Sequence, residues 1–205
     1  TFLICLKNRA HATKRLVKYL NNFKKSLNLF FADGGDIDQS DIIKTLLTHH
    51  NYTYKKFEVD KDYFYFANKI KNSLDLIKTK YCCFMDNDDF INFDSVLDQL
   101  RFLDENPTFY VSTGKIINFN LINNSKIDDL NELYNQDELV DFSSNFKFLN
   151  FSSWEGIHVT EKLFQIFNQI VINKIDNIRN ICDALNTSSQ VNGKIKFNKK
   201  DIFIL

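Results

Sequence analysis

The sequence predicts an α/β protein, with a mostly parallel sheet covered by helices. Short apolar runs of strand length alternate with amphipathic segments through the first 115 residues. The 205 residues are 44% hydrophobic, which is enough to bury one sizeable core and too much for a disordered chain. Five glycines and one proline exclude collagen-like and low-complexity chains. No apolar run approaches the length of a membrane span, so we expect none in this sequence.

The first half of the chain supplies the clearest elements. Buried strands are expected where four to eight apolar residues lie between polar ones, and helices where apolar side chains recur every three or four residues. Asp38 or Ser40 can cap the second helix, Asp94 can cap the fourth, and Pro107 closes that fourth helix. The predicted strands cover residues 1–7, 27–32, 52–59, 81–85 and 109–113, and the predicted helices cover about 9–25, 41–50, 62–78 and 94–106.

The second half is less regular. A sixth strand is expected over residues 116–121, followed by loops and short helices in the Asn-, Asp- and Ser-rich residues 122–153. One long helix is predicted over about 158–185, and a final strand or strand pair over 194–205. Because the sequence starts and ends inside apolar runs, we expect it to be a fragment of a longer chain.

Charge is distributed unevenly although it sums to zero. Residues 1–80 carry 15 basic and 8 acidic side chains, whereas residues 81–155 carry 4 and 14. A basic part beside an acidic part suits an anionic ligand together with a divalent cation, and an uneven solvated surface is an equal alternative. No block of lysine and arginine is long enough to predict nucleic-acid binding.

Cysteine and histidine give little sign of a zinc site. The four cysteines have no CxxC or Cys/His spacing, so we expect buried, reduced thiols in a cytosolic protein. His11, His49 and His50 are expected on the surface.

Polar residues follow three of the predicted strands. In open parallel sheets, ligands bind beyond the carboxyl ends of the strands. Those ends carry Lys7-Asn8-Arg9, Asp33-Gly34-Gly35 and Asp86-Asn87-Asp88-Asp89. These three segments are therefore the first candidates for a binding site.

The acidic segment after the fourth strand is the most informative of the three. Three carboxylates within four residues repel one another unless a cation lies between them, and Mg²⁺ or Mn²⁺ prefers oxygen ligands. The alternative is an acidic turn that caps the next helix, but Asp94 is already available for that cap. Asp86 and Asp88 are therefore predicted metal ligands.

The other two segments are weaker signals. Asp33 can accept hydrogen bonds from a base or a ribose where Gly34 and Gly35 permit close approach, although an ordinary strand-to-loop turn explains the same residues. Backbone amides at a helix start, together with Arg9, favour phosphate binding.

A last candidate segment precedes the predicted long helix and contains the only tryptophan. The Trp154 ring can stack on a sugar, the Glu155 carboxylate can deprotonate an acceptor hydroxyl, and His158 can ligate a metal or hold a phosphate. Core packing of Trp154 and a surface position for His158 are equally good explanations.

Together these segments resemble a family 2 glycosyltransferase with the GT-A fold. The similarity rests on residues 1–9 (TFLICLKNR), 31–35 (FADGG) and 84–90 (FMDNDDF), in that order and spacing, with Asn68 in the helix before the acidic motif. It covers residues 1–115 well and thins beyond them.

The resemblance implies a nucleotide-sugar donor bound along the strand ends by Lys7, Asn8, Arg9, Asp33 and Asp86. Residues 1–115 would then form the nucleotide-sugar-binding half of one GT-A domain and residues 116–205 its helical, acceptor-side half. Asp86 and Asp88 would form a DxD motif holding Mg²⁺ or Mn²⁺, with His158 as a further metal ligand.

For catalysis, the resemblance implies Glu155 as the base of an inverting transfer, with Trp154 beside the acceptor. The family often has a Glu-Asp pair at this point, whereas Gly156 follows Glu155 here, so Glu161 is kept as the fallback base. The acceptor would be a glycan, a lipid-linked molecule or a protein. The implied location is cytoplasmic, with peripheral attachment to the inner membrane face left open.

A non-catalytic nucleotide-sugar- or glycan-binding domain on the same fold is the main alternative, because fold does not fix function. A nucleotidyltransferase would need a Gly-rich basic loop after the first strand, and a dehalogenase-like phosphatase an aspartate pair there. The sequence leaves open the sugar, the nucleotide, the acceptor and the stereochemical outcome.

Overall fold

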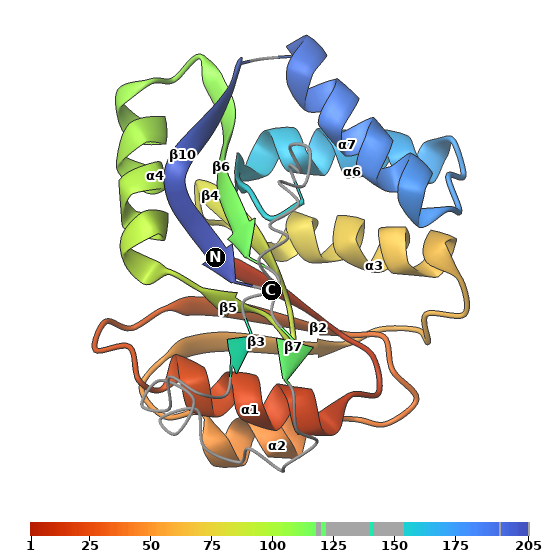
Figure 1. Cartoon of the computed structure of the whole chain (residues 1–205). Helices are drawn as coiled ribbons and strands as arrows, with labels where there is room; N and C mark the ends of the chain where they lie inside the picture. The colour runs from red at the N-terminus through yellow and green to blue at the C-terminus, as the bar shows by residue number, and fades with distance from the viewer. Residues whose placement is uncertain (118–119, 122–139, 142–153, 193, 205) are drawn as a thin grey trace.

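The structure is a computed structural model, and it describes residues 1–117, 120–121, 140–141, 154–192 and 194–204 (Figure 1). One set of strands runs parallel, and two short strands run against it. The parallel strands are β1 (Phe2–Leu6), β2 (Asn28–Asp33), β3 (Asn51–Lys56), β4 (Tyr81–Asp86), β6 (Phe109–Ile117) and β10 (Lys194–Ile204), and the antiparallel ones are β5 (Phe90–Ile91) and β9 (Ile157–Val159). Among the described residues, these eight strands form one sheet in the order β3-β2-β1-β4-β9-β6-β10-β5. Two further strands, β7 (Asn120–Leu121) and β8 (Val140–Asp141), pair with each other.

Helices cover both faces of the sheet (Figure 1). One face packs against α1 (Ala10–Leu20), α2 (Ser40–Leu46) and α4 (Phe93–Glu105), and the other against α3 (Tyr63–Leu76), α6 (Thr160–Ile172) and α7 (Ile178–Asn192). Because helices cover both faces, the sequence of β1 is apolar throughout. Its side chains alternate between the two cores, with Ile4 and Leu6 in the first and Leu3 and Cys5 in the second.

The predicted long helix is wrong. Residues 157–159 form strand β9, which pairs antiparallel with both β4 and β6, and two separate helices follow it. Between these helices Lys174 adopts a left-handed backbone with φ of 51°, a conformation that cannot continue a right-handed helix. The apolar residues whose spacing predicted one helix belong to three elements, a short buried strand and the two helices after it.

Smaller differences occur at element ends. The N-cap of α4 is Asn92, whose side chain accepts a hydrogen bond from the Ser95 backbone N–H at 3.2 Å, and Asp94 lies in the first turn. The predicted fifth and sixth strands join into β6, with β7 separate. Residues 194–204 form one strand with two register shifts, one between Lys194 and Ile195 and one between Phe197 and Ile202.

His50 is a core residue, contrary to the expectation that it lies on the surface. Its side chain is buried, and its Nδ1 accepts a hydrogen bond from the Leu27 backbone N–H at 3.1 Å. The ring Nε2 therefore carries the proton and donates to the Leu20 carbonyl oxygen at 2.8 Å. Burial lowers the pKa of His50 below its ordinary value, which keeps the ring in this neutral form.

The cysteines are free thiols, with Cys5, Cys82 and Cys83 buried and Cys182 half-buried. Burial raises the pKa of Cys5 and Cys82 to about 12, so these thiols stay protonated and unreactive. In the part of the chain that the structure describes, every helix is too short or too polar to cross a membrane.

Candidate active site

The carboxyl ends of β1 and β4 border a cavity of about 320 Å³. Four basic side chains, Lys7, Arg9, Lys61 and Lys69, line it together with the carboxylates of Asp60, Asp62 and Asp86. Since β1 pairs with β4 in parallel, the residues after each strand emerge at the same edge of the sheet. The cavity therefore lies where parallel-sheet proteins bind ligands, and its cationic lining suits an anionic group.

Four carboxylates gather beside this cavity. Burial, with the nearby charges of Asp88 and Glu155, raises the pKa of Asp86 to about 6. Burial, with the charge of Asp86, likewise raises the pKa of Asp89 to about 7. Crowding of negative charge at a half-buried site is the electrostatic signature of a place that a cation would stabilise.

The acidic loop is fastened to the start of α1. Asp88 forms an exposed ion pair with Arg9. Asn87 is fully buried, and its side-chain amide donates to the Arg9 carbonyl oxygen at 3.2 Å and to the Thr13 hydroxyl at 3.0 Å. The segments after β1 and β4, almost 80 residues apart in the chain, are thus held together by hydrogen bonds.

The donor set fits Mg²⁺ or Mn²⁺ in its chemistry. Asp86 and Asp88 offer carboxylate oxygens, and the raised pKa of Asp86 reflects its burial together with the nearby negative charges of Asp88 and Glu155. Within the described residues, no three acidic, histidine or cysteine side chains converge on one point as a complete metal cage. Mg²⁺ commonly takes only one or two carboxylates from the protein and the rest of its ligands from substrate phosphates and water, so the residues present fit that mode.

Asp33 is not among the residues that line the cavity, and its contact with the nucleoside stays a prediction. Its carboxylate is fully buried and is already occupied by the protein. It accepts hydrogen bonds from Gly35 N–H at 2.8 Å and from the Tyr54 hydroxyl at 2.6 Å, and Lys56 lies 3.3 Å away. In the donor-free chain Asp33 therefore fixes the loop after β2.

Asn8 has a similar role. Its Oδ1 accepts from the Asp36 backbone N–H at 2.7 Å, and its Nδ2 donates to the Asp36 carboxylate at 2.6 Å. A Cβ on Gly35 would lie 2.6 Å from the Asn8 side chain, and one on Gly34 would collide with the Asp60 carboxylate. Both glycines are thus required because the loops after β1, β2 and β3 approach so closely.

A buried ion pair, which the sequence did not suggest, forms part of the cavity wall. Lys69 and Asp60 are both almost fully buried and are paired through the Lys69 ammonium and Asp60 Oδ2. Asp60 Oδ1 is buried and has no hydrogen-bond partner among the described residues. Burial raises the pKa of Asp60, against the opposing charge of Lys69.

Glu155 lies close to the acidic loop. The β4–β9 register pairs Cys83 with Ile157, and two further residues bring Glu155 level with Met85, just before Asp86. Its charge raises the pKa of both Asp86 and Asp89. Antiparallel strand β9, which the sequence did not predict, is therefore what carries Glu155 back to this edge.

Trp154 is engaged in packing. Its ring stacks on Phe84, with ring centroids 4.5 Å apart and an interplanar angle of 11°, and also lies 5.9 Å from Phe66. This placement favours the core-packing explanation over a sugar platform.

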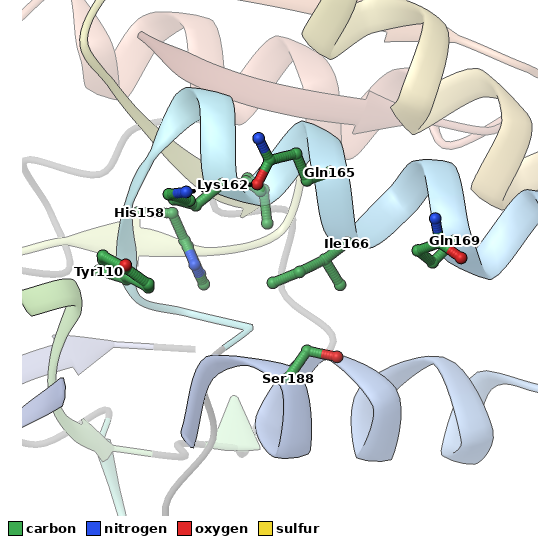
Figure 2. Close-up of a pocket in the computed structure, with 8 residues that line it drawn as sticks. Tyr110, His158, Lys162, Gln165, Ile166, Gln169 and Ser188 are labelled. Atoms are coloured by element: carbon green, nitrogen blue, oxygen red, sulfur yellow. Dashed lines mark hydrogen bonds between the residues drawn. The ribbon is translucent and has the colours of Figure 1, made fainter. Parts of the chain in front are cut away.

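His158 lies away from the acidic loop, and its metal role stays a prediction. It sits in β9 opposite Cys82, four residues before Asp86, or about 13 Å along the strand. Its side chain points into a separate cavity of about 410 Å³ between α6 and α7 (Figure 2). Glu161, the fallback base, follows β9 in the first turn of α6 and so lies toward the amino-terminal edge of the parallel strands.

Similar folds occur in several solved structures. Staphylococcus aureus TarS 1–349 matches with a TM-score of 0.64 and 16% identity, over 100% of this chain and 60% of that one. The Pyrobaculum calidifontis mannosyltransferase PcManGT, solved with GDP-Man and Mn²⁺, matches with a TM-score of 0.63 and 10% identity, over 100% of this chain and 55% of that one. This chain thus spans about 60% of the length of the TarS 1–349 structure.

A different activity occurs on a similar fold. The 4-diphosphocytidyl-2C-methyl-D-erythritol synthase of Anaerococcus prevotii matches with a TM-score of 0.60 and 11% identity, over 97% of this chain and 87% of that one. Comparison with curated proteins gave no match. These likenesses establish the GT-A-like fold.

The sequence profile described as glycosyl transferase family 2 matches residues 1–166. That range includes the cavity, the acidic loop and Glu155. On this match, the chain belongs to glycosyl transferase family 2.

Proposed function

We propose that this glycosyltransferase domain moves a sugar from a nucleotide-sugar donor to an acceptor hydroxyl, with inversion and with dependence on Mg²⁺ or Mn²⁺. The observation that carries the proposal is the cavity at the sheet edge, where Lys7, Arg9 and Lys69 meet the carboxylate of Asp86. Solved proteins of similar fold were studied with UDP-GlcNAc and with GDP-Man and Mn²⁺. A nucleoside diphosphate carries the negative charge that this lining would neutralise.

Each residue has a defined task in this proposal. Lys7 and Arg9 hold the diphosphate, and Asp86 and Asp88 hold the metal. When bound, Mg²⁺ or Mn²⁺ supplies positive charge to the leaving diphosphate. Glu155 accepts the proton of the acceptor hydroxyl as the oxygen attacks the sugar carbon.

The buried oxygen of Glu155 supports this role for the carboxylate. Its Oε2 is buried and has no hydrogen-bond partner among the described residues. No described donor competes for that oxygen, so an acceptor hydroxyl that reaches it after the side chain turns toward the cavity would remove the cost of an unpaired buried acceptor. The acceptor itself stays open among a glycan, a lipid-linked molecule and a protein, and the cytoplasmic location stays a prediction.

Calorimetry with UDP, GDP, UDP-GlcNAc and GDP-Man, each with and without Mn²⁺, tests the proposal. We expect at least one of them to bind only when Mn²⁺ is present, and Asp88→Ala to abolish that binding while the protein stays folded. Asp98→Ala is the matched control, because Asp98 also forms an exposed ion pair with an arginine, at 3.1 Å, but on α4. Failure of all four ligands to bind would contradict the proposal, and binding without sugar transfer to any acceptor would favour the non-catalytic alternative.

A further inference from the structure

Arg9 is fixed by its backbone while its side chain remains accessible. The preceding residue, Asn8, has a left-handed φ of 60°, and its side chain is tied to the loop after β2. The carbonyl oxygen of Arg9 accepts from the buried side chain of Asn87. The Arg9 side chain, by contrast, is 47% exposed. The guanidinium can therefore exchange partners without any movement of its anchor.

In the structure the Arg9 guanidinium is paired with the Asp88 carboxylate. The ion pair joins Arg9 Nη1 to Asp88 Oδ2, and the Arg9 charge also acts on the Asp86 carboxylate. It thus offsets part of the negative charge that Asp86, Asp88, Asp89 and Glu155 gather in one place. Arg9 is in the position of a counter-cation for the two carboxylates that the proposed function assigns to the metal.

The same side chain lines the cavity. Lys7, Arg9 and Lys69 surround the space in which the proposed function puts the donor diphosphate. A guanidinium matches two phosphate oxygens with two parallel N–H donors, and such charge-assisted pairs are stronger than an exposed carboxylate pair. A diphosphate in the cavity would therefore compete successfully with Asp88 for Arg9.

We propose that Arg9 acts as the resident counter-cation of Asp88 in the donor-free chain, and that the donor diphosphate draws it away and so frees Asp88 for the divalent metal. This inference rests on the proposed function. It makes binding of metal and donor cooperative, because Arg9 weakens metal binding until the donor arrives. Because coupling between two ligands is reciprocal, bound metal strengthens donor binding by the same factor.

Electron paramagnetic resonance of Mn²⁺, which measures free and bound metal directly, tests the inference without an activity assay. Mn²⁺ is titrated into the chain alone and into the chain with UDP, or with GDP if the calorimetry above selects it. The variants are Arg9→Gln, which has lost the charge, and Arg9→Lys, which keeps the charge but not the two-pronged donor. Arg101→Gln is the control, since Arg101 also forms an ion pair with an aspartate, Asp98 on α4, and that pair is more exposed than the Arg9–Asp88 pair.

Loss of the Arg9 charge should have opposite effects on the two ligands. In Arg9→Gln we expect Mn²⁺ alone to bind about two- to fivefold more tightly, the range for release of an exposed ion pair. The nucleotide at saturating Mn²⁺ should bind about tenfold more weakly, because a charge-assisted hydrogen bond to phosphate is lost. The factor by which nucleotide improves Mn²⁺ binding should shrink, Arg9→Lys should fall between, and Arg101→Gln should behave as the parent protein.

The alternative outcomes separate the inference from the function on which it rests. If Mn²⁺ alone binds Arg9→Gln no more tightly than the parent protein, the counter-cation role is overturned while Mn²⁺-dependent nucleotide binding remains. If Mn²⁺ binds more tightly but nucleotide affinity is unchanged, the exchange to the diphosphate is overturned. If the parent protein binds no nucleotide with Mn²⁺, both the proposed function and this inference fail.

Discussion

Removal of Lys69, the buried lysine in the cavity wall, should destabilise the protein strongly. Lys69→Met keeps the length and the apolar stem of the side chain but leaves the Asp60 carboxylate buried without its counter-charge. Breaking a buried ion pair in this way costs about 3–5 kcal/mol of unfolding free energy. For a domain of this size each kcal/mol lowers the midpoint of thermal unfolding by about 2–4 °C, so a decrease of about 6–20 °C is expected.

The double variant Asp60→Asn/Lys69→Met identifies the cause. Because both charges are gone, it should recover much of the stability that the single variant loses. Urea unfolding followed by the fluorescence of Trp154, the only tryptophan, measures the free energy for each variant. Lys61→Met is the control, since Lys61 pairs with Glu58 at the surface and should leave the unfolding midpoint unchanged.

The loss in Lys69→Met should also depend on pH. The pKa of Asp60 is raised in the folded protein, and removal of Lys69 raises it further because the lysine charge opposes the effect of burial. A carboxyl whose folded pKa exceeds its unfolded value of about 4 loses stability as the pH rises between those two values. Lys69→Met should therefore be less impaired at pH 5 than at pH 8. Equal losses at both pH values, or a double variant as unstable as the single one, would refute the reasoning.

Three further changes test other parts of the molecule. Glu155→Gln should keep Mn²⁺-dependent nucleotide binding by calorimetry and lose about 10²–10⁴ in transfer rate, and near-normal turnover would remove Glu155 from the mechanism. Because the pKa of His50 lies below its ordinary value, the stabilisation from its neutral ring is present above pH 6.5 and declines below it by up to about 1.4 kcal/mol per pH unit. In His50→Gln the free energy of unfolding, measured with urea from pH 7.5 to 5.5, should fall less steeply. An unchanged slope would show that His50 is not the cause of the decline. Gly34→Ala should lower both the unfolding midpoint and nucleotide affinity, because its Cβ would collide with the Asp60 carboxylate, and a variant that matches the parent protein in both would contradict that contact.

The parallel part of the sheet and its ligand-binding edge could be predicted from the sequence. Strands buried on both faces read as continuous apolar runs, and the polar residues after them necessarily emerge together. That logic located Asp86, Asp88 and Arg9 at one edge. It also located Asp33 there, but the sequence gives no sign that Tyr54 and Lys56 on the neighbouring strand would occupy its carboxylate.

Other features depend on long-range packing that no local pattern reveals. Asp60 and Lys69 are charged residues on either side of an aromatic-rich segment, 63–66, and only the fold buries them as a pair. His50 follows His49 in a loop, and its burial depends on backbone groups of Leu20 and Leu27. Strand β9 has three residues, too few for period-2 alternation to be distinguished from the helical pattern that follows.

The position of β9 has a consequence for how the protein is made. On the ribosome, β4 and β6 are synthesised well before the strand that must lie between them, so both keep an unpaired edge until residue 159 has emerged. Unpaired strand edges are aggregation-prone, and contacts between residues far apart in the chain form slowly. A nascent chain is thus exposed to misassembly during this interval, and chaperones would act on it then. Since Glu155 lies two residues before β9, the same docking event that joins β4 to β6 also delivers the carboxylate to the cavity edge.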